Sequence, residues 1–124
     1  GGAVLIEGTA EESFRIPIDA DFAYSTGIYI SGHVEPQDEP AYLLPKYARA
    51  LTLERLYYTG KIDFSVEGMK QLLSHHAPDP GSVCRHNRDA GFCTQSARIM
   101  IPGEGKLLIS DGRPCENAFE EFSL

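Results

Sequence analysis

The chain has no even set of cysteines, no excess of basic residues and no long apolar run, and each absence excludes a class of protein. Three cysteines cannot all pair with one another, so a complete internal disulfide framework is excluded; reduced thiols are expected, which favours the cytoplasm without fixing the compartment. Eleven basic residues against eighteen acidic ones give a net charge of −7, which repels a phosphate backbone. No apolar run is long enough to span a bilayer. Neither a nucleic-acid partner nor a membrane partner is therefore expected.

Length and composition predict one globular domain over residues 1–124. The chain starts at Gly1-Gly2 with neither an initiator methionine nor a signal-peptide pattern. We therefore expect a processed start or a lost upstream segment, which would make these residues the C-terminal portion of a larger fold.

The first third of the sequence predicts three strands. Residues 3–7 are a short apolar run, and residues 13–18 alternate between apolar and polar side chains. Residues 22–31 carry spaced aromatic and β-branched residues and are predicted to be the third strand.

Two helices follow in the prediction. The first covers residues 45–58, with Pro45 in its first turn, Gly60 after its end, and a buried stripe made of Leu44, Tyr47, Ala48 and Leu51. The second covers residues 66–74 and starts from Ser65 as N-cap, with Val66, Met69, Leu72 and Leu73 on its apolar face.

The end of the chain predicts a hairpin. Residues 94–101 and 106–110 are strand-like, and the turn signal Pro-Gly-Glu-Gly lies between them. Phe119 and Phe122 are expected to anchor the C-terminus in the core. Strands, then helices, then strands predict an α+β fold with antiparallel strands and two helices.

Four short features in the last fifty residues carry a family resemblance. They are a helix ending in histidine before a proline turn, the run Ser82-Val83-Cys84-Arg85-His86, the hairpin, and the corner Gly112-Arg113-Pro114-Cys115. In this order they resemble the C-terminal end of the acyl-coenzyme A:6-aminopenicillanate acyltransferase family of N-terminal-nucleophile amide hydrolases. The resemblance implies part of a four-layer αββα sandwich that acts on a small amide or acyl substrate without a cofactor.

In the resembled mechanism an N-terminal cysteine is the nucleophile and its own α-amine is the base. Cys84, Cys93 and Cys115 are all internal, so none of them can take this role. The resemblance therefore implies a partner, either a second chain or an upstream segment that carries an N-terminal Cys. The partner would cover open sheet edges, as would a homo-oligomer.

The resemblance also implies two groups of site residues. A Thr-Asn-His run supplies an oxyanion donor in related enzymes, and its counterpart here has Gly27 in place of asparagine and Ile28 in place of histidine. Thr26 and Gly27 could then act only through backbone N–H groups, and the alternative is a plain strand with a glycine bulge. Arg49 is the candidate for holding a substrate carboxylate, with a solvated helix face as its alternative.

The histidines and cysteines allow a zinc hypothesis. Cys84 and His86 could join His75, His76 and Cys93, but no Cys-x-x-Cys pair is present, so we expect no metal.

Cys84 and His86 could also form a nucleophilic pair, for which no orienting third residue is evident. The favoured interpretation is structural: a buried Cys84, an Arg85-His86 pair that fastens its loop by hydrogen bonds, and Cys115 packed in a corner. Two functions remain, a subunit of an amide hydrolase or acyltransferase and a non-catalytic scaffold that binds a small ligand or a protein partner.

Overall fold

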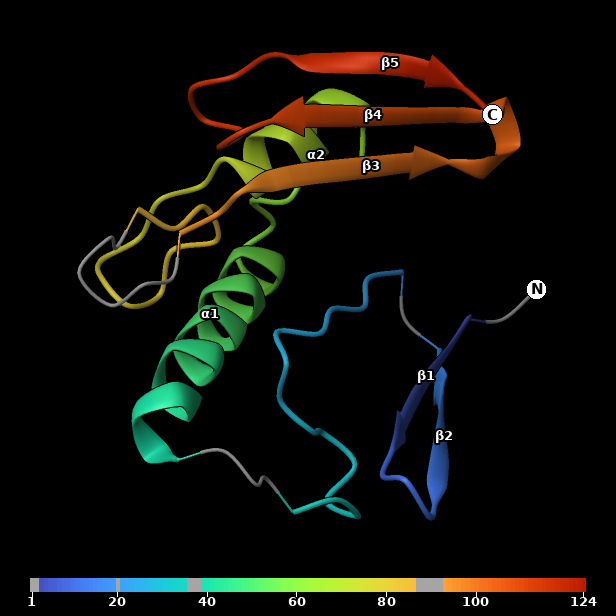
Figure 1. Ribbon diagram of the computed structural model, residues 1–124, viewed down its shortest axis with the longest axis vertical. Coiled ribbons are helices and arrows are strands. Elements are labelled where there is room, and N and C mark those ends of the chain that lie inside the picture. The colour runs from blue at the N-terminus through green and yellow to red at the C-terminus, as the bar shows by residue number, and fades with distance from the viewer. Residues whose placement is uncertain (1–2, 20, 36–38, 87–92) are drawn as a thin grey trace.

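Two helices and two antiparallel sheets make up the fold, which confirms the predicted α+β class. The structure is a computed structural model that describes residues 3–19, 21–35, 39–86 and 93–124. The smaller sheet has two strands and the larger has three, in the order β3-β4-β5 (Figure 1).

The first sheet is a hairpin made of the first two predicted strands. Strands β1 (Ala3–Gly8) and β2 (Ser13–Ile18) pair antiparallel from Ala3↔Ile18 to Gly8↔Ser13. The Thr9 hydroxyl closes the turn by accepting the backbone N–H groups of Glu11 and Glu12, each at 3.2 Å. The alternation of β2 is confirmed, because every second side chain is half-buried. In Figure 1 this hairpin stands apart from the helices and from the other sheet.

The predicted third strand at residues 22–31 is wrong, because this segment is irregular. Gly27 and Gly32 both have positive φ angles, +83° and +73°, which interrupt an extended path. The segment is held by side chains instead of a ladder: the Thr26 hydroxyl donates to the Lys46 carbonyl at 2.8 Å, and Ile30 N–H donates to the Glu7 carboxylate at 2.5 Å.

Helix α1 (Pro40–Tyr58) starts earlier than predicted and turns a different face to the protein. Pro40 occupies the first position, while Pro45 lies inside the helix. The predicted stripe is wrong, since Leu44 and Leu51 are 63% and 65% exposed. The buried residues are Ala50, Thr52, Leu53 and Leu56. Gly60 ends the helix as predicted, with φ +66°.

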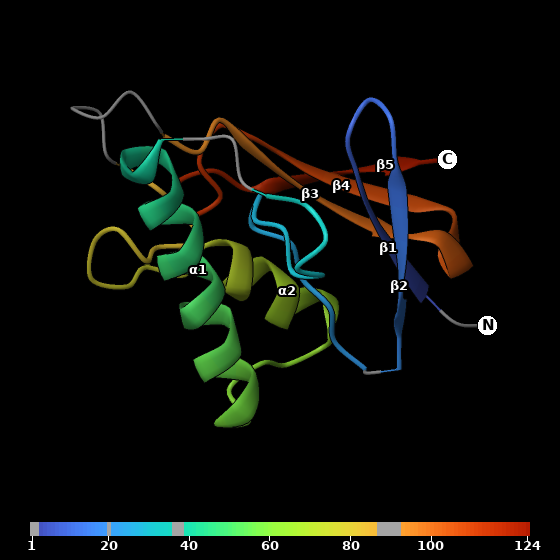
Figure 2. The same cartoon turned by 90° about the horizontal axis from the view of Figure 1, so that it is seen from below.

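Helix α2 (Val66–Leu73) follows its prediction closely. The Ser65 hydroxyl accepts the Gly68 N–H at 3.0 Å, which confirms the N-cap. Gly68 itself is buried, and a Cβ at this position would collide with the Asp63 carbonyl, so the glycine allows a close approach. The helix contacts β3 and lies against one face of the larger sheet (Figure 2).

The larger sheet contains the predicted hairpin and one strand that was not predicted. Strands β3 (Ser96–Ile101) and β4 (Lys106–Asp111) are joined by a 3-10 turn, Pro102–Glu104, and by Gly105 at φ +60°. Strand β5 (Phe119–Ser123) then pairs with β4 from Ser110↔Phe119 to Lys106↔Ser123. Phe119 is half-buried, but Phe122 is 46% exposed, so the predicted anchoring is wrong for Phe122.

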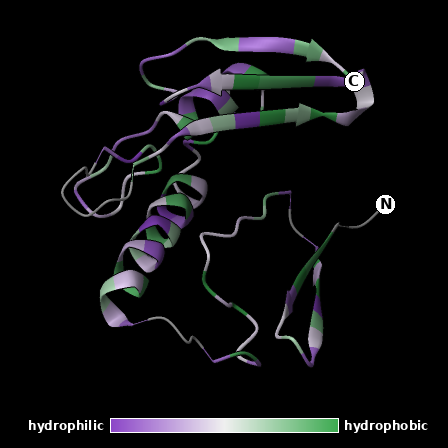
Figure 3. Cartoon of the chain, in the orientation of Figure 1, coloured by the Kyte–Doolittle hydropathy of each residue, from purple (hydrophilic) through white to green (hydrophobic). Residues whose placement is uncertain are grey.

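The core is small relative to the apolar surface that stays exposed. Its buried apolar members are Val34, Ala50, Leu53, Leu56, Cys84, Ala97 and Leu108. Figure 3 shows the central strand β4 as mostly hydrophobic, and β1 likewise carries several hydrophobic residues. Within the described residues, no helix is both long enough and apolar enough to cross a bilayer.

Candidate functional site

Two of the three predicted site residues meet in space. Arg49 lies on α1 and Thr26 lies in the irregular segment before it, and the Arg49 Nη2 donates to the Thr26 carbonyl at 3.2 Å. The Thr26 hydroxyl donates to the Lys46 carbonyl, one turn earlier on α1. These two hydrogen bonds fix the segment to the helix at the level of Arg49.

Thr26 and Arg49 line a cavity of about 230 Å³. Its walls come from the irregular segment, from α1, from the end of α2 and from Val83, and most of them are apolar. The lining residues are Phe22, Tyr24, Ser25, Thr26, Arg49, Leu53, Leu72, Leu73 and Val83. An apolar cavity with one cationic group at its wall suits a small acyl group that carries an anion.

The positive charge of the Arg49 guanidinium is only partly balanced by its surroundings. Burial lowers its pKa, and the positive charge of Arg85 lowers the pKa further. Its Nε is buried and has no hydrogen-bond partner among the described residues. Arginine stays protonated at neutral pH in spite of such shifts, so a bound anion would stabilise this group.

Gly27 does not belong to this cavity. It is exposed, and a Cβ built on it would face the Lys46 side chain at 3.6 Å. The Thr26 hydroxyl already donates to a carbonyl, so only backbone N–H groups are left for the expected oxyanion role. That role stays a prediction.

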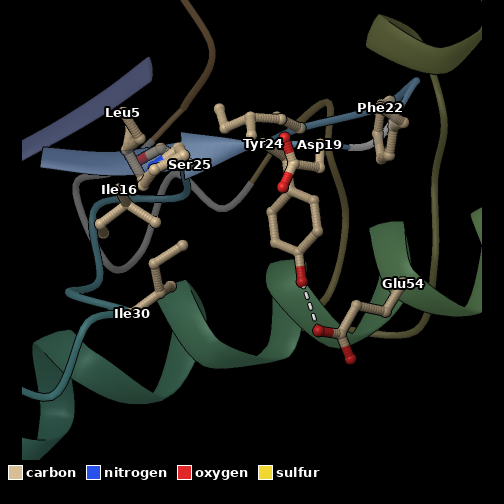
Figure 4. A pocket seen from close by; sticks show the side chains of 11 residues that line it. Leu5, Ile16, Asp19, Phe22, Tyr24, Ser25, Ile30 and Glu54 are labelled. Atoms are coloured by element: carbon tan, nitrogen blue, oxygen red, sulfur yellow. Dashed lines mark hydrogen bonds between the residues drawn. The ribbon is translucent and has the colours of Figure 1, made fainter. Parts of the chain in front are cut away.

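A larger groove, not predicted from the sequence, shares Phe22, Tyr24 and Ser25 with this cavity, and Figure 4 shows the side chains that line it. Its volume is about 510 Å³, and its mostly apolar wall includes Leu5, Ile16, Ile18, Phe22 and Ile30. The Tyr24 hydroxyl donates to Glu54 Oε1 at 2.5 Å across the groove. Burial raises the pKa of Tyr24, and the bond to Glu54 raises it further, so the phenol stays protonated. The pair joins residues 30 positions apart, which no local pattern could reveal.

Four cysteine and histidine side chains lie together, and two others that the sequence suggested lie apart from them. Cys84 and His86 lie next to His76 and Cys115. Cys93 is separate and contacts the Gln95 side chain, and His75 is not part of the group either. The loop itself is fastened through the backbone of Arg85, whose N–H donates to the Thr94 hydroxyl at 2.9 Å and whose carbonyl accepts the Thr94 N–H at 3.0 Å.

The Cys84–His86 pair is unsuited to nucleophilic catalysis. Cys84 is fully buried, and burial, reinforced by the contact with Cys115, raises the pKa of its thiol to about 11. Its Sγ lies 3.8 Å from His86 Nε2. A protonated, inaccessible thiol at neutral pH cannot attack a substrate.

Comparison of the chain with protein-family models, with curated proteins and with solved structures found no match. The resemblance to the acyltransferase family therefore stays a prediction from the sequence.

Proposed function

We propose that this chain is the C-terminal portion of a cysteine-dependent amide hydrolase or acyltransferase with an αββα architecture. Its part in the site is the pocket wall that contains Thr26 and Arg49, and Gly27, which lies outside the pocket, could contribute only its backbone N–H. The reactive thiol comes from a second chain or an upstream segment that begins with cysteine.

The observation that carries the proposal is the state of Arg49. A half-buried guanidinium lines an apolar cavity, and its Nε has no hydrogen-bond partner among the described residues. A substrate carboxylate would supply the missing acceptor and two parallel charge-assisted hydrogen bonds. Arg49 is also the residue that the family resemblance assigns to this task.

The exposed surfaces support a covering partner. Strands β3 and β5 are the edges of the larger sheet, and such edges are templates for further pairing. Leu44, Tyr47 and Leu51 form an apolar stripe along α1, each at least 43% exposed. An upstream segment or a second chain that completes the sandwich would cover both.

The chemistry follows from the resembled mechanism. The N-terminal cysteine sulfur attacks the amide carbonyl carbon while its α-amine takes the thiol proton. The amine leaves with that proton, and a thioester remains. Water or an acceptor amine then cleaves the thioester and restores the thiol. Arg49 binds the substrate carboxylate and so orients the carbonyl for attack.

Arg49→Gln in the complete enzyme tests the proposal. We expect kcat/KM for an acyl amide bearing a carboxylate to fall by about 10- to 100-fold, because a hydrogen bond to a charged group is worth ~1.5–3 kcal/mol. For the methyl ester of the same substrate, kcat/KM should fall only a little. Arg55→Gln is the matched control, because Arg55 is exposed on the same helix, and it should leave kcat/KM unchanged for both substrates. Equal losses on both substrates, or no loss, would contradict the proposal.

The second candidate is a non-catalytic scaffold that binds a small ligand or a protein partner, and Gly27 favours it. A glycine at the position where related enzymes carry asparagine provides no side-chain donor for an oxyanion. Intact mass of the native material separates the two candidates. A co-purifying polypeptide that starts with cysteine supports the enzyme, and a lone chain supports the scaffold.

A further inference from the structure

Four soft ligand atoms converge at one point outside the Arg49 cavity. They belong to His76, Cys84, His86 and Cys115, and all lie within 4.8 Å of one another. The two sulfurs are 3.5 Å apart, and His86 Nε2 lies 3.1 Å from the Cys115 sulfur and 3.0 Å from His76 Nε2. The Cys84 sulfur is 3.8 Å from His86 Nε2.

These separations are close to those of a tetrahedral zinc site. Bond lengths of ~2.3 Å to sulfur and ~2.0–2.1 Å to nitrogen require ligand separations of ~3.8 Å between sulfurs, ~3.3 Å between nitrogens and ~3.5 Å for mixed pairs. The four separations given above differ from these values by a few tenths of an ångström, and the widest pair of ligand atoms, at up to 4.8 Å, would have to close by about 1 Å when the ion binds. Against our expectation from the sequence spacing, we propose that His76, Cys84, His86 and Cys115 bind one zinc ion as a structural Cys2His2 site.

The positions of the ligands favour a structural role. The first three ligands lie in the segment after α2, and Cys115 lies in the connection between β4 and β5. Figure 1 shows this connection close to the segment after α2. Four protein ligands leave no open position for substrate, which is typical of structural zinc. The ion would connect the helical part of the chain to the larger sheet, in addition to the packing of α2 on β3.

A disulfide and a catalytic thiol explain the cluster less well. Cys84 and Cys115 are free thiols, and a disulfide between them would leave two histidine nitrogens facing each other with no common partner. A catalytic thiol would need access for substrate, but Cys84 is fully buried beside Cys115. A cation explains all four side chains, because each offers a lone pair to the same point.

The residues around His86 provide an outer shell. Nδ1 of His86 lies 3.0 Å from Arg113 Nη1 and 3.8 Å from Glu116 Oε1. Arginine can only donate, so this bond requires an unprotonated Nδ1 in the metal-free protein. Zinc on Nε2 requires the proton on Nδ1, so the Arg113 contact is given up and Glu116 becomes the acceptor. Two thiols each release one proton when the ion binds.

Titration of the full chain with Co²⁺ and Zn²⁺, after reduction and removal of metal, tests the site. We expect one equivalent of Co²⁺ to bind, with the visible absorption of tetrahedral cobalt and a thiolate charge-transfer band, and Zn²⁺ to displace it. Zinc should also raise the melting temperature, because the ion binds the folded chain more tightly than the unfolded one. These readouts are independent of amide hydrolysis, so failure here leaves the proposed enzyme function untouched.

Single substitutions identify the ligands. His76→Ala changes an exposed side chain, so the fold should survive, and affinity should fall by more than the ~10- to 100-fold typical of an outer-shell change. Glu116→Gln should weaken binding by about 10-fold. Cys93→Ala and His75→Ala are the matched controls and should bind like the unchanged protein. Failure of the reduced chain to take up cobalt, unchanged affinity in His76→Ala, or loss of binding in Cys93→Ala would overturn the proposal.

Discussion

Glu7 shows at the scale of one residue how the irregular segment is held in place. The residue is only 5% exposed, and its carboxylate accepts three hydrogen bonds, from Ile30 N–H at 2.5 Å, from Ser31 N–H at 3.1 Å and from the Ser31 hydroxyl at 2.5 Å. Burial raises the pKa of Glu7, but the bonds from Ser31 and Ile30 outweigh it, so the net pKa is lowered. A strand residue therefore anchors the segment that also carries Thr26.

The lowered pKa of Glu7 predicts acid sensitivity of this anchor. Because the folded pKa is below the unfolded value of about 4.3, the stabilisation is present above that pH and is lost as pH falls through the folded pKa. Amide hydrogen exchange at Ile30 and Ser31 should therefore lose protection in acid. In Glu7→Gln the protection should be weaker at neutral pH and should vary less with pH. The same pH dependence in both proteins would contradict this assignment.

At the scale of single elements, the two helices differ in how well their sequences describe them. Helix α2 was predicted from Ser65 and a short apolar face, and both signals are local. In α1 the start and the buried face were predicted wrongly. Pro45 is tolerated inside the helix, and the apolar stripe at Leu44, Tyr47 and Leu51 faces solvent. Periodicity identifies an apolar face, but only tertiary packing decides which face is covered within the chain.

The orientation of α1 predicts that two leucine substitutions differ in their effect on stability. Leu53 is 9% exposed and lines the Arg49 cavity, whereas Leu51 is 65% exposed. Leu53→Ala should lower the free energy of unfolding by about 2–4 kcal/mol, and Leu51→Ala should change it by less than about 0.5 kcal/mol. Urea denaturation measures both. A larger loss of unfolding free energy in Leu51→Ala than in Leu53→Ala would contradict this orientation and support the buried stripe predicted from the sequence.

At the scale of the whole molecule, the order of strands and helices was sufficient to predict the α+β class, and local signals predicted the hairpin of β3 and β4. It was insufficient for the path of residues 22–31, where Gly27 and Gly32 and the bonds to Glu7 replace a strand ladder. Thr26 and Arg49, which the resemblance named, line one cavity that excludes Gly27, and the roles given to all three stay predictions. The convergence of Cys84 with Cys115 could not be predicted, because 31 residues and a sheet separate them.

The whole-molecule proposal assigns the reactive sulfur to another segment, so the decisive measurement locates that sulfur. The native protein is treated with a thiol-alkylating reagent while acyl-amide turnover is followed, and the modified residue is identified by peptide mass mapping. We predict that the label whose incorporation tracks inactivation lies on the N-terminal cysteine of an upstream segment or second polypeptide. Inactivation that instead tracks labelling of Cys84, Cys93 or Cys115 would contradict the proposal.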